Sequence, residues 1–259
     1  MDLGLDGRVA VVTGASRGIG LAVTRALVDE GVRVVAGARS SSPELDAVAK
    51  SGAVTIVEVD LADPLGPARL VGEAAEEIDI LVNNVGHAAV RTGGFLSVTD
   101  AEWQESVDLN LLPAVRATRS ALPMMLAAGR GSIVNIASVN TTLSDPMVID
   151  YSATKAALAS FSKALSKEVG PHGIRVNTIS PGPVATPMWL GGGGVAEAVA
   201  RAAGTDPDAV VDQAAHQSVT GRFSQPEEIA DLVLLLASDR TANVTGADVR
   251  IDGGLIPTW

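Results

Sequence analysis

The chain contains a single tyrosine, Tyr151, which stands four residues before Lys155. Residues four apart lie on one face of a helix, so this spacing would place a phenol and an ammonium group about one turn apart. A nearby positive charge favours the phenolate and is expected to lower the phenol's pKa from about 10. A group that exchanges protons near neutral pH is what carbonyl reduction or alcohol oxidation requires. Tyr151 and Lys155 are therefore candidate acid–base residues, although the spacing also occurs in ordinary helices.

Strand-like and helix-like segments alternate along the rest of the chain. The expected strands are 9–13, 33–38, 54–59, 80–83, 132–137, 174–179 and 248–251. The expected helices are 18–30, 43–50, 64–77, 100–128, 151–169 and 226–237. Pro113 and Pro123 are expected to kink or divide the longest of these. Such alternation predicts βαβ units, a parallel sheet and right-handed crossovers. We expect an α/β fold: a single Rossmann-type domain over residues 1–259, with a doubly wound parallel sheet flanked by helices.

The composition narrows the possible partners. Apolar residues make up 47% of the chain, aromatic residues only 3%, and the net charge is −11. This acidic balance argues against nucleic acid and against an anionic membrane surface as partners. No apolar run is long enough to cross a membrane, and no signal pattern is visible. The absence of cysteine excludes disulfides and thiol chemistry, and no histidines or acids have metal-ligand spacing. We expect a cytoplasmic protein that uses no metal.

A glycine-rich loop follows the first expected strand and opens the first expected helix. Glycines let the backbone approach a ligand closely, and a helix N-terminus offers unpaired N–H groups to a pyrophosphate. The spacing G-x-x-x-G-x-G in this setting indicates dinucleotide binding, with a structural tight turn as the alternative. The loop residues expected to contact the cofactor are Gly14, Ser16, Arg17, Gly18, Ile19 and Gly20.

The same loop also matches the G-x-S-x-G nucleophile elbow of hydrolases, with Ser16 as the nucleophile. That chemistry needs a histidine base, for which the chain offers His87, His172 and His216. It also needs an oxyanion loop from an earlier strand, and too few residues precede Ser16 to form one. We therefore favour the dinucleotide interpretation.

The end of the second expected strand bears on the choice of cofactor. NAD-binding proteins tend to place an acid there to bind the ribose 2′-hydroxyl. Here the strand runs into Arg39 and Ser40, without a carboxylate. Arg39 and Arg17 would bind a 2′-phosphate through charge-assisted hydrogen bonds. This predicts NADP(H) in preference to NAD(H); the alternative is two solvated surface arginines.

Five motifs in this order resemble the short-chain dehydrogenase/reductase family, from about Gly7 to Gly254. They are the glycine loop, Asn83-Asn84-Val85-Gly86, Ser138, the Tyr151–Lys155 pair and Pro181-Gly182. The resemblance implies one Rossmann-type domain with a seven-stranded parallel sheet. The family more often has alanine where this chain has Val85, and the larger side chain would tighten the cofactor groove.

The resemblance also implies a catalytic set of Ser138, Tyr151, Lys155 and Asn110. Ser138 would hydrogen-bond the substrate carbonyl while Tyr151 gives that oxygen a proton and the nicotinamide delivers hydride to carbon. Lys155 would lower the pKa of Tyr151 and hold the nicotinamide ribose. Asn110 would anchor a water that links Lys155 to solvent. The alternatives are a strand-end hydroxyl for Ser138 and a helix-face amide for Asn110.

Further cofactor contacts are implied by the same resemblance. Asp60 would bind the adenine amino group, although an aspartate after a strand is also a common turn former. Leu61 would meet the adenine plane. The remaining implied contacts, to the ribose, diphosphate and nicotinamide, are Asn83, Gly86, Tyr151, Lys155, Pro181, Gly182, Val184 and Thr186.

Two segments suggest function beyond the motifs. Residues from about 184 to 221 interrupt the alternation and include four consecutive glycines at 191–194, which predicts a substrate-covering lid with a flexible hinge. The tail 253–259 is apolar and ends at Trp259, which fits burial in a homotetramer or homodimer. The expected partner is a small-molecule ketone or secondary alcohol. An acyl-carrier-linked 3-oxoacyl reductase and a catalytically silent dinucleotide-binding protein are the alternatives.

Overall fold

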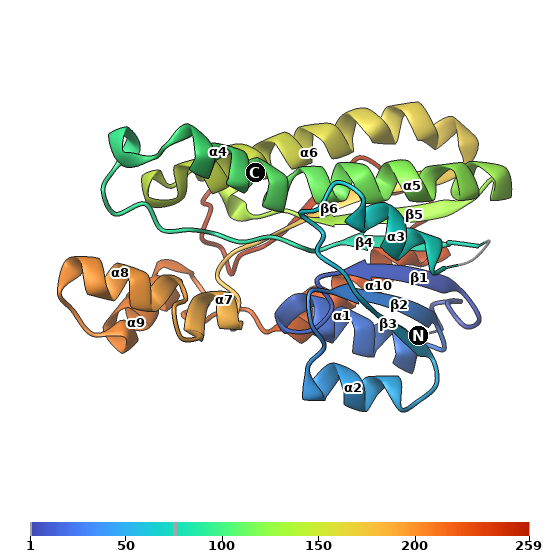
Figure 1. Cartoon of the computed structure of the whole chain (residues 1–259), viewed down its shortest axis with the longest axis horizontal. Coiled ribbons are helices and arrows are strands. Elements are labelled where there is room, and N and C mark those ends of the chain that lie inside the picture. Colours follow the sequence, from blue (N-terminus) through green and yellow to red (C-terminus); the bar gives the residue numbers. More distant parts are fainter. Residues whose placement is uncertain (1, 75–76, 259) are drawn as a thin grey trace.

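The computed structural model describes residues 2–74 and 77–258. Within this part of the chain, seven strands form one parallel sheet in the order β3-β2-β1-β4-β5-β6-β7 (Figure 1). The strands are β1 (Val9–Thr13), β2 (Arg33–Ala38), β3 (Val54–Glu58), β4 (Ile80–Asn83), β5 (Gly131–Ile136), β6 (Ile174–Pro181) and β7 (Asp248–Ile251). The order reverses between β1 and β4, so the sheet is doubly wound, as predicted.

The central strands are buried on both faces, which explains their aliphatic, β-branched sequences. All five residues of β1, Val-Ala-Val-Val-Thr, are buried. Val11 pairs with Val35 on one side and Leu81 on the other, so three aliphatic residues lie abreast across the sheet. This pairing register is specific, because a shift of one residue would turn every side chain of a strand to the opposite face of the sheet.

Helices cover both faces of the sheet (Figure 1). α1 packs against α10 on one face, and α3, α5 and α6 pack on the other. The helices are α1 (Gly18–Asp29), α2 (Pro43–Ala49), α3 (Gly66–Gly72), α4 (Asp100–Asn110), α5 (Leu112–Ala128), α6 (Ile149–Val169), α7 (Pro187–Leu190), α8 (Val195–Ala203), α9 (Pro207–Gln217) and α10 (Pro226–Ala237). α3 is shorter than the expected helix 64–77, of which residues 75–76 lie outside the described part.

The expected long helix 100–128 is divided, as its prolines predicted. The division falls at Leu111, whose φ of −120° and ψ of −57° lie outside the helical range. Pro113 then sits in the first turn of α5, where its missing N–H needs no partner. Pro123 lies inside α5 without dividing it. The consequence is that α4 ends at Asn110, beside the site described below.

The glycine run at 191–194 forms a compact turn between α7 and α8. The N–H of Gly191 donates to the Pro187 carbonyl oxygen at 3.0 Å, and that of Gly194 to the Gly191 carbonyl oxygen at 2.8 Å. A Cβ at Gly194 would lie 2.9 Å from the Met188 carbonyl oxygen. Glycine is therefore needed at this position for close packing, and the flexible hinge stays a prediction.

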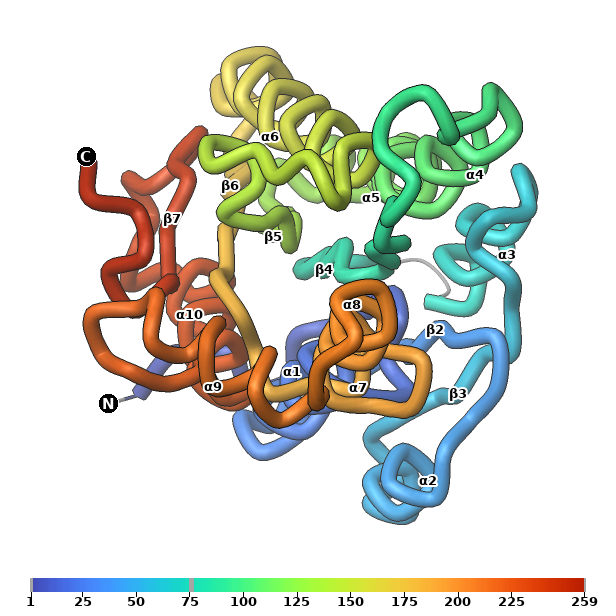
Figure 2. Tube along the Cα trace, turned by 90° about the vertical axis from the view of Figure 1, so that its left-hand side faces the viewer, coloured from blue at the N-terminus to red at the C-terminus, as the bar shows by residue number. Residues whose placement is uncertain are grey.

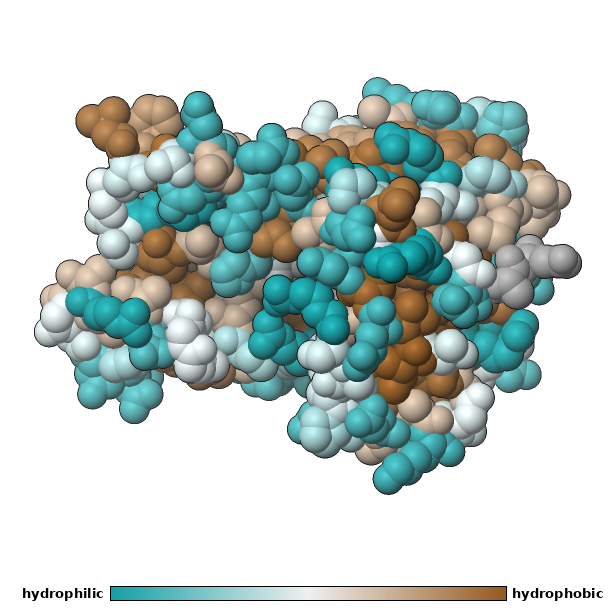
Figure 3. Space-filling view, in the orientation of Figure 1, coloured by the Kyte–Doolittle hydropathy of each residue, from teal (hydrophilic) through white to brown (hydrophobic). Residues whose placement is uncertain are grey.

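One face of the molecule has an apolar recess. On the face shown in Figure 3, apolar side chains line this recess between the end of the molecule that carries α4 and the end that carries α7, α8 and α9.

In the described ranges 2–74 and 77–258, no helix is both long and apolar enough to cross a membrane.

Candidate active site

The motifs meet at the carboxyl edge of the sheet. The glycine loop follows β1, Asn83 ends β4, Ser138 lies just beyond β5, and Pro181 ends β6. Figure 2 looks onto this edge, with α7, α8 and α9 towards the viewer. Because parallel strands all end at the same edge, segments far apart in sequence converge there, and ligands of such folds bind at the reversal of strand order.

The glycine loop has the geometry of an anion site. Gly14 and Gly18 have φ of +69° and +54°, which favour glycine, and a Cβ at Gly20 would lie 2.2 Å from the Gly14 carbonyl oxygen. Arg17 is the N-cap of α1, and its side chain makes no capping hydrogen bond. The first-turn N–H groups of α1 are thus free of side-chain acceptors, and the helix dipole adds partial positive charge. These features fit the diphosphate of a dinucleotide.

Two residues that the sequence analysis left without a role hold this loop in place. The Thr13 hydroxyl donates to the Val82 carbonyl oxygen at 3.3 Å and accepts from the N–H of Asn84 at 2.9 Å. The Asn84 amide donates to the carbonyl oxygens of Thr13 at 3.0 Å and Gly14 at 3.2 Å. Asn84 therefore ties the β1 loop to the β4 loop. Its place in the Asn-Asn motif was visible in sequence, but its partners were not.

A hollow of about 510 Å³ beside the loop is lined by Arg39, Asp60 and Ala62 on one side and by α4 on the other. Arg39, Arg17 and Ser40 are exposed, as a phosphate contact requires. Asp60 also accepts a hydrogen bond from the Ala62 N–H at 3.0 Å, so it is a turn former as well as a lining residue.

One acid near this hollow was not predicted from the sequence. Glu58, at the end of β3, accepts a hydrogen bond from the Ser41 N–H at 3.3 Å. β3 is the edge strand beside β2, so the fold brings this carboxylate next to the residues that follow Arg39. A carboxylate is therefore present in the neighbourhood after all, although not on the second strand.

Tyr151 and Lys155 lie on one face of α6, as their spacing predicted. Both are buried, with relative exposures of 8% and 2%, and Ser138 beside them is 7% exposed. The Lys155 ammonium donates to the Ile136 carbonyl oxygen at 2.8 Å and lies 5.7 Å from the centroid of the Tyr151 ring. The end of β5 and the first turns of α6 thus bring the three side chains together.

The protonation of the pair differs from the sequence expectation. Burial raises the pKa of Tyr151 to about 12, and the hydrogen bond with Ser138 only partly opposes this. Burial also lowers the pKa of Lys155 to about 8. Removing a charged group from water disfavours the charged form, and here this outweighs the attraction expected between ammonium and phenolate. The predicted net fall in the pKa of Tyr151 is therefore wrong for this structure, in which the pKa is raised.

Both ends of the Asn110 side-chain amide bind protein groups. Its Oδ1 accepts from the His87 N–H at 2.8 Å, and its Nδ2 donates to the Ser106 carbonyl oxygen at 3.0 Å. A Cβ at Gly86 would lie 3.0 Å from Asn110 Oδ1 and 3.1 Å from Lys155 Nζ. Gly86 thus leaves a narrow space between these side chains, and Asn110 fixes the start of the β4–α4 connection. Its water-relay role stays a prediction.

Asn140 orients Ser138, a role that the sequence analysis did not assign. The Ser138 hydroxyl donates to Asn140 Oδ1 at 2.9 Å and accepts from the Asn140 N–H at 3.2 Å. Asn140 Nδ2 in turn donates to the Ser152 hydroxyl at 3.3 Å. This chain of hydrogen bonds links the end of β5 to α6 and holds the hydroxyl beside Tyr151.

Three of the residues implied to touch the cofactor have buried side chains. The Asn83 Nδ2 donates to Asn135 Oδ1 at 2.8 Å and Thr118 Oγ1 at 3.2 Å. The alternation of the strand turns this side chain towards α5, and its contact with a cofactor stays a prediction. Leu61 and Val184 are 3% and 4% exposed and belong to the two hydrophobic cores. Contact of the Leu61 or Val184 side chain with a cofactor therefore has no support here.

The segment after β6 does reach the glycine loop. Gly182 donates its N–H to the Ile251 carbonyl oxygen at 2.9 Å, and a Cβ there would lie 2.9 Å from the Asp252 Cα. Further on, Thr186 Cγ2 lies 3.2 Å from where a Gly18 Cβ would be. The chain from Pro181 to Thr186 therefore crosses from the end of β6 to the start of α1, the place expected for the nicotinamide segment.

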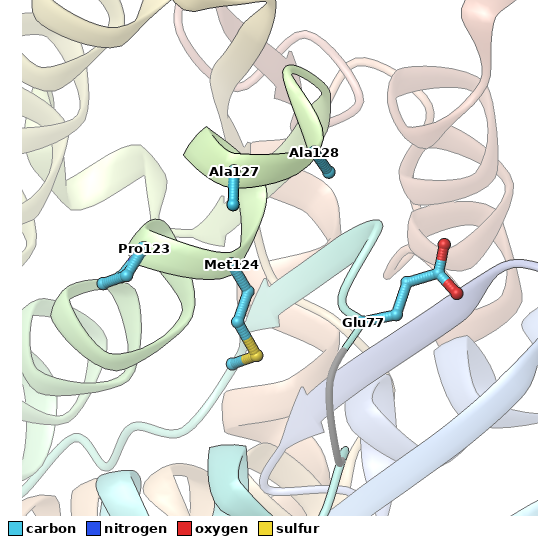
Figure 4. A pocket seen from close by; sticks show the side chains of 5 residues that line it. All are labelled: Glu77, Pro123, Met124, Ala127 and Ala128. Atoms are coloured by element: carbon cyan, nitrogen blue, oxygen red, sulfur yellow. The ribbon is translucent and has the colours of Figure 1, made fainter.

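A second hollow lies at the opposite edge of the sheet. It measures about 570 Å³ and is lined by Glu77, Pro123, Met124, Ala127 and Ala128 (Figure 4). Among the residues that the structure describes, Glu77 is its only ionisable lining residue, and the last turns of α5 form its wall. The convergence of buried polar groups is therefore at the carboxyl edge, and this hollow is not the active site.

The fold and the site define the class of protein. A family model described as enoyl-(acyl carrier protein) reductase matches residues 14–256. The chain belongs to the short-chain dehydrogenase/reductase family and is an oxidoreductase. This membership favours the dinucleotide interpretation of the glycine loop over the hydrolase one.

Individual relatives span the full chain. L-xylulose reductase from Bos taurus is 36% identical and covers 100% of both chains. The 3-oxoacyl-[acyl-carrier-protein] reductase FabG from Vibrio harveyi is 32% identical over 98% of this chain and 99% of its own. Among solved structures, L-sorbose reductase from Gluconobacter frateurii, complexed with NADPH and L-sorbose, is 35% identical with a TM-score of 0.90 and covers 100% of both chains.

Proposed function

We propose that the protein is an NADP(H)-dependent oxidoreductase that interconverts a small ketone and its secondary alcohol. The observation that carries this is the convergence of three buried side chains, Ser138, Tyr151 and Lys155, beside a glycine loop with an uncapped helix N-terminus. When bound there, the nicotinamide supplies or accepts the hydride. Turnover of a panel of ketones and alcohols, followed by nicotinamide absorbance, tests the proposal; NADPH binding without any turnover would instead support a silent dinucleotide-binding protein.

The protein's own residues would handle the proton. With a pKa of about 12, Tyr151 is protonated at neutral pH and suits the reducing direction as a proton donor. Its phenol gives a proton to the carbonyl oxygen as the carbonyl carbon gains hydride, and an alcohol results. Ser138 binds the same oxygen. A protonated Lys155 would stabilise the phenolate that remains, because opposite charges attract strongly in a site shielded from water.

The preference for NADP(H) over NAD(H) is a separate part of the proposal. Its support is the exposed Arg39, which lines the hollow of about 510 Å³, the exposed Arg17 of the glycine loop, and the NADPH bound by the sorbose reductase relative. Glu58 works against it, since a carboxylate near a 2′-phosphate is repulsive. Steady-state KM values for both cofactors test it, and equal use of NADH would contradict it.

For the substrate we propose a small polyhydroxylated ketone. The sorbose and xylulose reductase relatives support this, and so do the polar residues Asn140, Thr141 and Thr142 that follow Ser138. The second candidate is a carrier-bound 3-oxoacyl group, favoured by the FabG relative. A basic patch for an acidic carrier has less support, since Arg130 precedes β5 and so lies roughly 20 Å from the site, the length of that strand. The substrate panel should include both classes.

We further propose that residues 1–259 act as one domain, that the 184–221 segment covers the substrate, and that the protein is a homotetramer or homodimer. The contact of Thr186 with the glycine loop supports a covering role for α7, α8 and α9. Support for the oligomer is the apolar tail, of which Trp259 lies outside the described residues. Light scattering tests the assembly, and a monomer at micromolar concentration would contradict it.

A further inference from the structure

The connection from β4 to α4 contains an arginine that none of the motifs includes. Arg91 has a side-chain exposure of only 12%. Its Nη2 donates to Asp150 Oδ2 at 2.6 Å, its Nε lies 3.3 Å from both oxygens of that carboxylate, and its Nη1 donates to Glu102 Oε1 at 2.8 Å. Its backbone N–H donates to the Met147 carbonyl oxygen at 2.7 Å. One residue thus joins three separate elements.

The partners of Arg91 are attached to the catalytic helices. Asp150 lies in the first turn of α6, directly before Tyr151, and its side chain is 2% exposed. Glu102 closes the capping box at the start of α4, the helix that ends at Asn110. α4 and α6 also pack against each other (Figure 1). The guanidinium therefore bridges the beginnings of the two helices that carry Asn110, Tyr151 and Lys155.

The other end of the same connection is fixed as well. The His87 N–H donates to Asn110 Oδ1, and Gly86 lies between Asn110 and the Lys155 ammonium. The segment 86–91 is thus held at its start by Asn110 and at its end by Asp150. A shift of Arg91 would be transmitted to the first turn of α6 because the chain between these two anchors is short.

We propose that Arg91, through Asp150 and Glu102, is a positioning residue that holds Tyr151 in its catalytic place. This rests on the proposed function, because it concerns the proton donor of that reaction. The planar guanidinium suits the task, since it can bind two carboxylates in fixed directions, whereas a lysine is a point charge on a flexible stem. Misplacing a catalytic group by about 1 Å costs on the order of 100-fold in rate.

The test compares Arg91→Met with Arg130→Met. Arg130 also pairs with a buried aspartate, Asp79, but at the other edge of the sheet. For Arg91→Met we expect kcat to fall about 10- to 100-fold with the dissociation constant for NADPH changed less than about threefold. Arg91→Lys should recover part of the loss. Arg130→Met should lower the melting temperature and leave kcat within about twofold of the wild type.

A second measurement needs no substrate. Tyr151 is the only tyrosine, so tyrosine nitration by tetranitromethane, followed by mass spectrometry, reports on the accessibility and ionisation of this one phenol. Arg91→Met should be nitrated several-fold faster than the wild type and Arg130→Met. If the wild type turns over no substrate, the proposed function fails and nitration alone tests the positioning role. Unchanged kcat and nitration in Arg91→Met, or equal changes in Arg130→Met, would overturn it.

Discussion

Two buried aspartates at opposite edges of the sheet are each paired with arginine, but they serve different parts of the molecule. Asp79 precedes β4 at the amino edge; it accepts the Val9 N–H at 3.0 Å and the Arg130 Nε at 3.0 Å. Asp150 precedes Tyr151 at the carboxyl edge and is bound by Arg91. The first pair joins the starts of neighbouring strands, and the second joins a long connection to a catalytic helix.

The surroundings of the two arginines differ as well. The Arg130 side chain is 53% exposed and that of Arg91 only 12%. Water screens the first pair, which therefore holds the edge of the sheet without setting the geometry of a site. The second is shielded, and removing one partner would leave a buried charge uncompensated. We infer that the first pair stabilises the sheet and that, in the proposed mechanism, the second places Tyr151.

The largest effect is expected at the carboxyl edge itself, from Tyr151→Phe. This change removes the only phenol of the chain but keeps the ring, so packing and NADPH binding should be retained. Loss of the proton donor should lower kcat by roughly 10²- to 10⁴-fold, measured as nicotinamide absorbance with a substrate of the wild type. A variant that keeps its activity would refute the assigned mechanism.

The comparison is tested directly by Asp79→Asn against Asp150→Asn. Asp150→Asn leaves the shielded Arg91 without this buried carboxylate and should lower the free energy of unfolding by about 3 kcal/mol or more in urea titrations. Asp79→Asn should lower it by less, because its arginine partner is exposed to water. Only Asp150→Asn should also lower kcat, because only Asp150 is attached to the turn that carries Tyr151. Loss of kcat in the properly folded Asp79→Asn protein would remove the distinction between the two edges.

The lowered pKa of Lys155 predicts how the stability of the protein depends on pH. Its folded pKa of about 8 lies below the ordinary value of 10.5, so between these pH values the unfolded state binds more protons. The stability of the cofactor-free protein should therefore rise with pH across this window, by up to about 3 kcal/mol. Lys155→Met should abolish the rise, and Lys163→Met, at the surface, should not. An unchanged pH profile in Lys155→Met would contradict the burial argument.

The smallest effect is expected from the proposed 2′-phosphate contact. Arg39→Ala should raise the KM for NADPH about tenfold and leave that for NADH nearly unchanged, since one charge-assisted hydrogen bond contributes about 1.5 kcal/mol or more. Arg33→Ala, at the other end of β2, is the matched control and should change neither. Equal changes in KM for both cofactors would show that Arg39 does not bind the 2′-phosphate.

The elements that the sequence predicted well are those specified by neighbouring residues. β1, β2 and β4 begin and end as expected because short aliphatic runs are bounded by turn residues. The division before Pro113 followed from the missing N–H of proline. The glycine run is a different case: Gly191 and Gly194 are required by contacts with carbonyl oxygens of α7, which composition alone does not reveal.

The sequence by itself determined the strand–helix alternation, the glycine loop at the start of α1, and the one-face placement of Tyr151 and Lys155, because each depends on local spacing. Only the tertiary structure decided the partners that lie far apart in the chain: Arg91 with Asp150, Glu58 beside the Arg39 region, and the side chain of Asn83 turned towards α5. The tertiary structure also raises the pKa of Tyr151, where the sequence predicted a fall. Burial depends on all the groups packed around a side chain, whereas sequence spacing identifies only one neighbour.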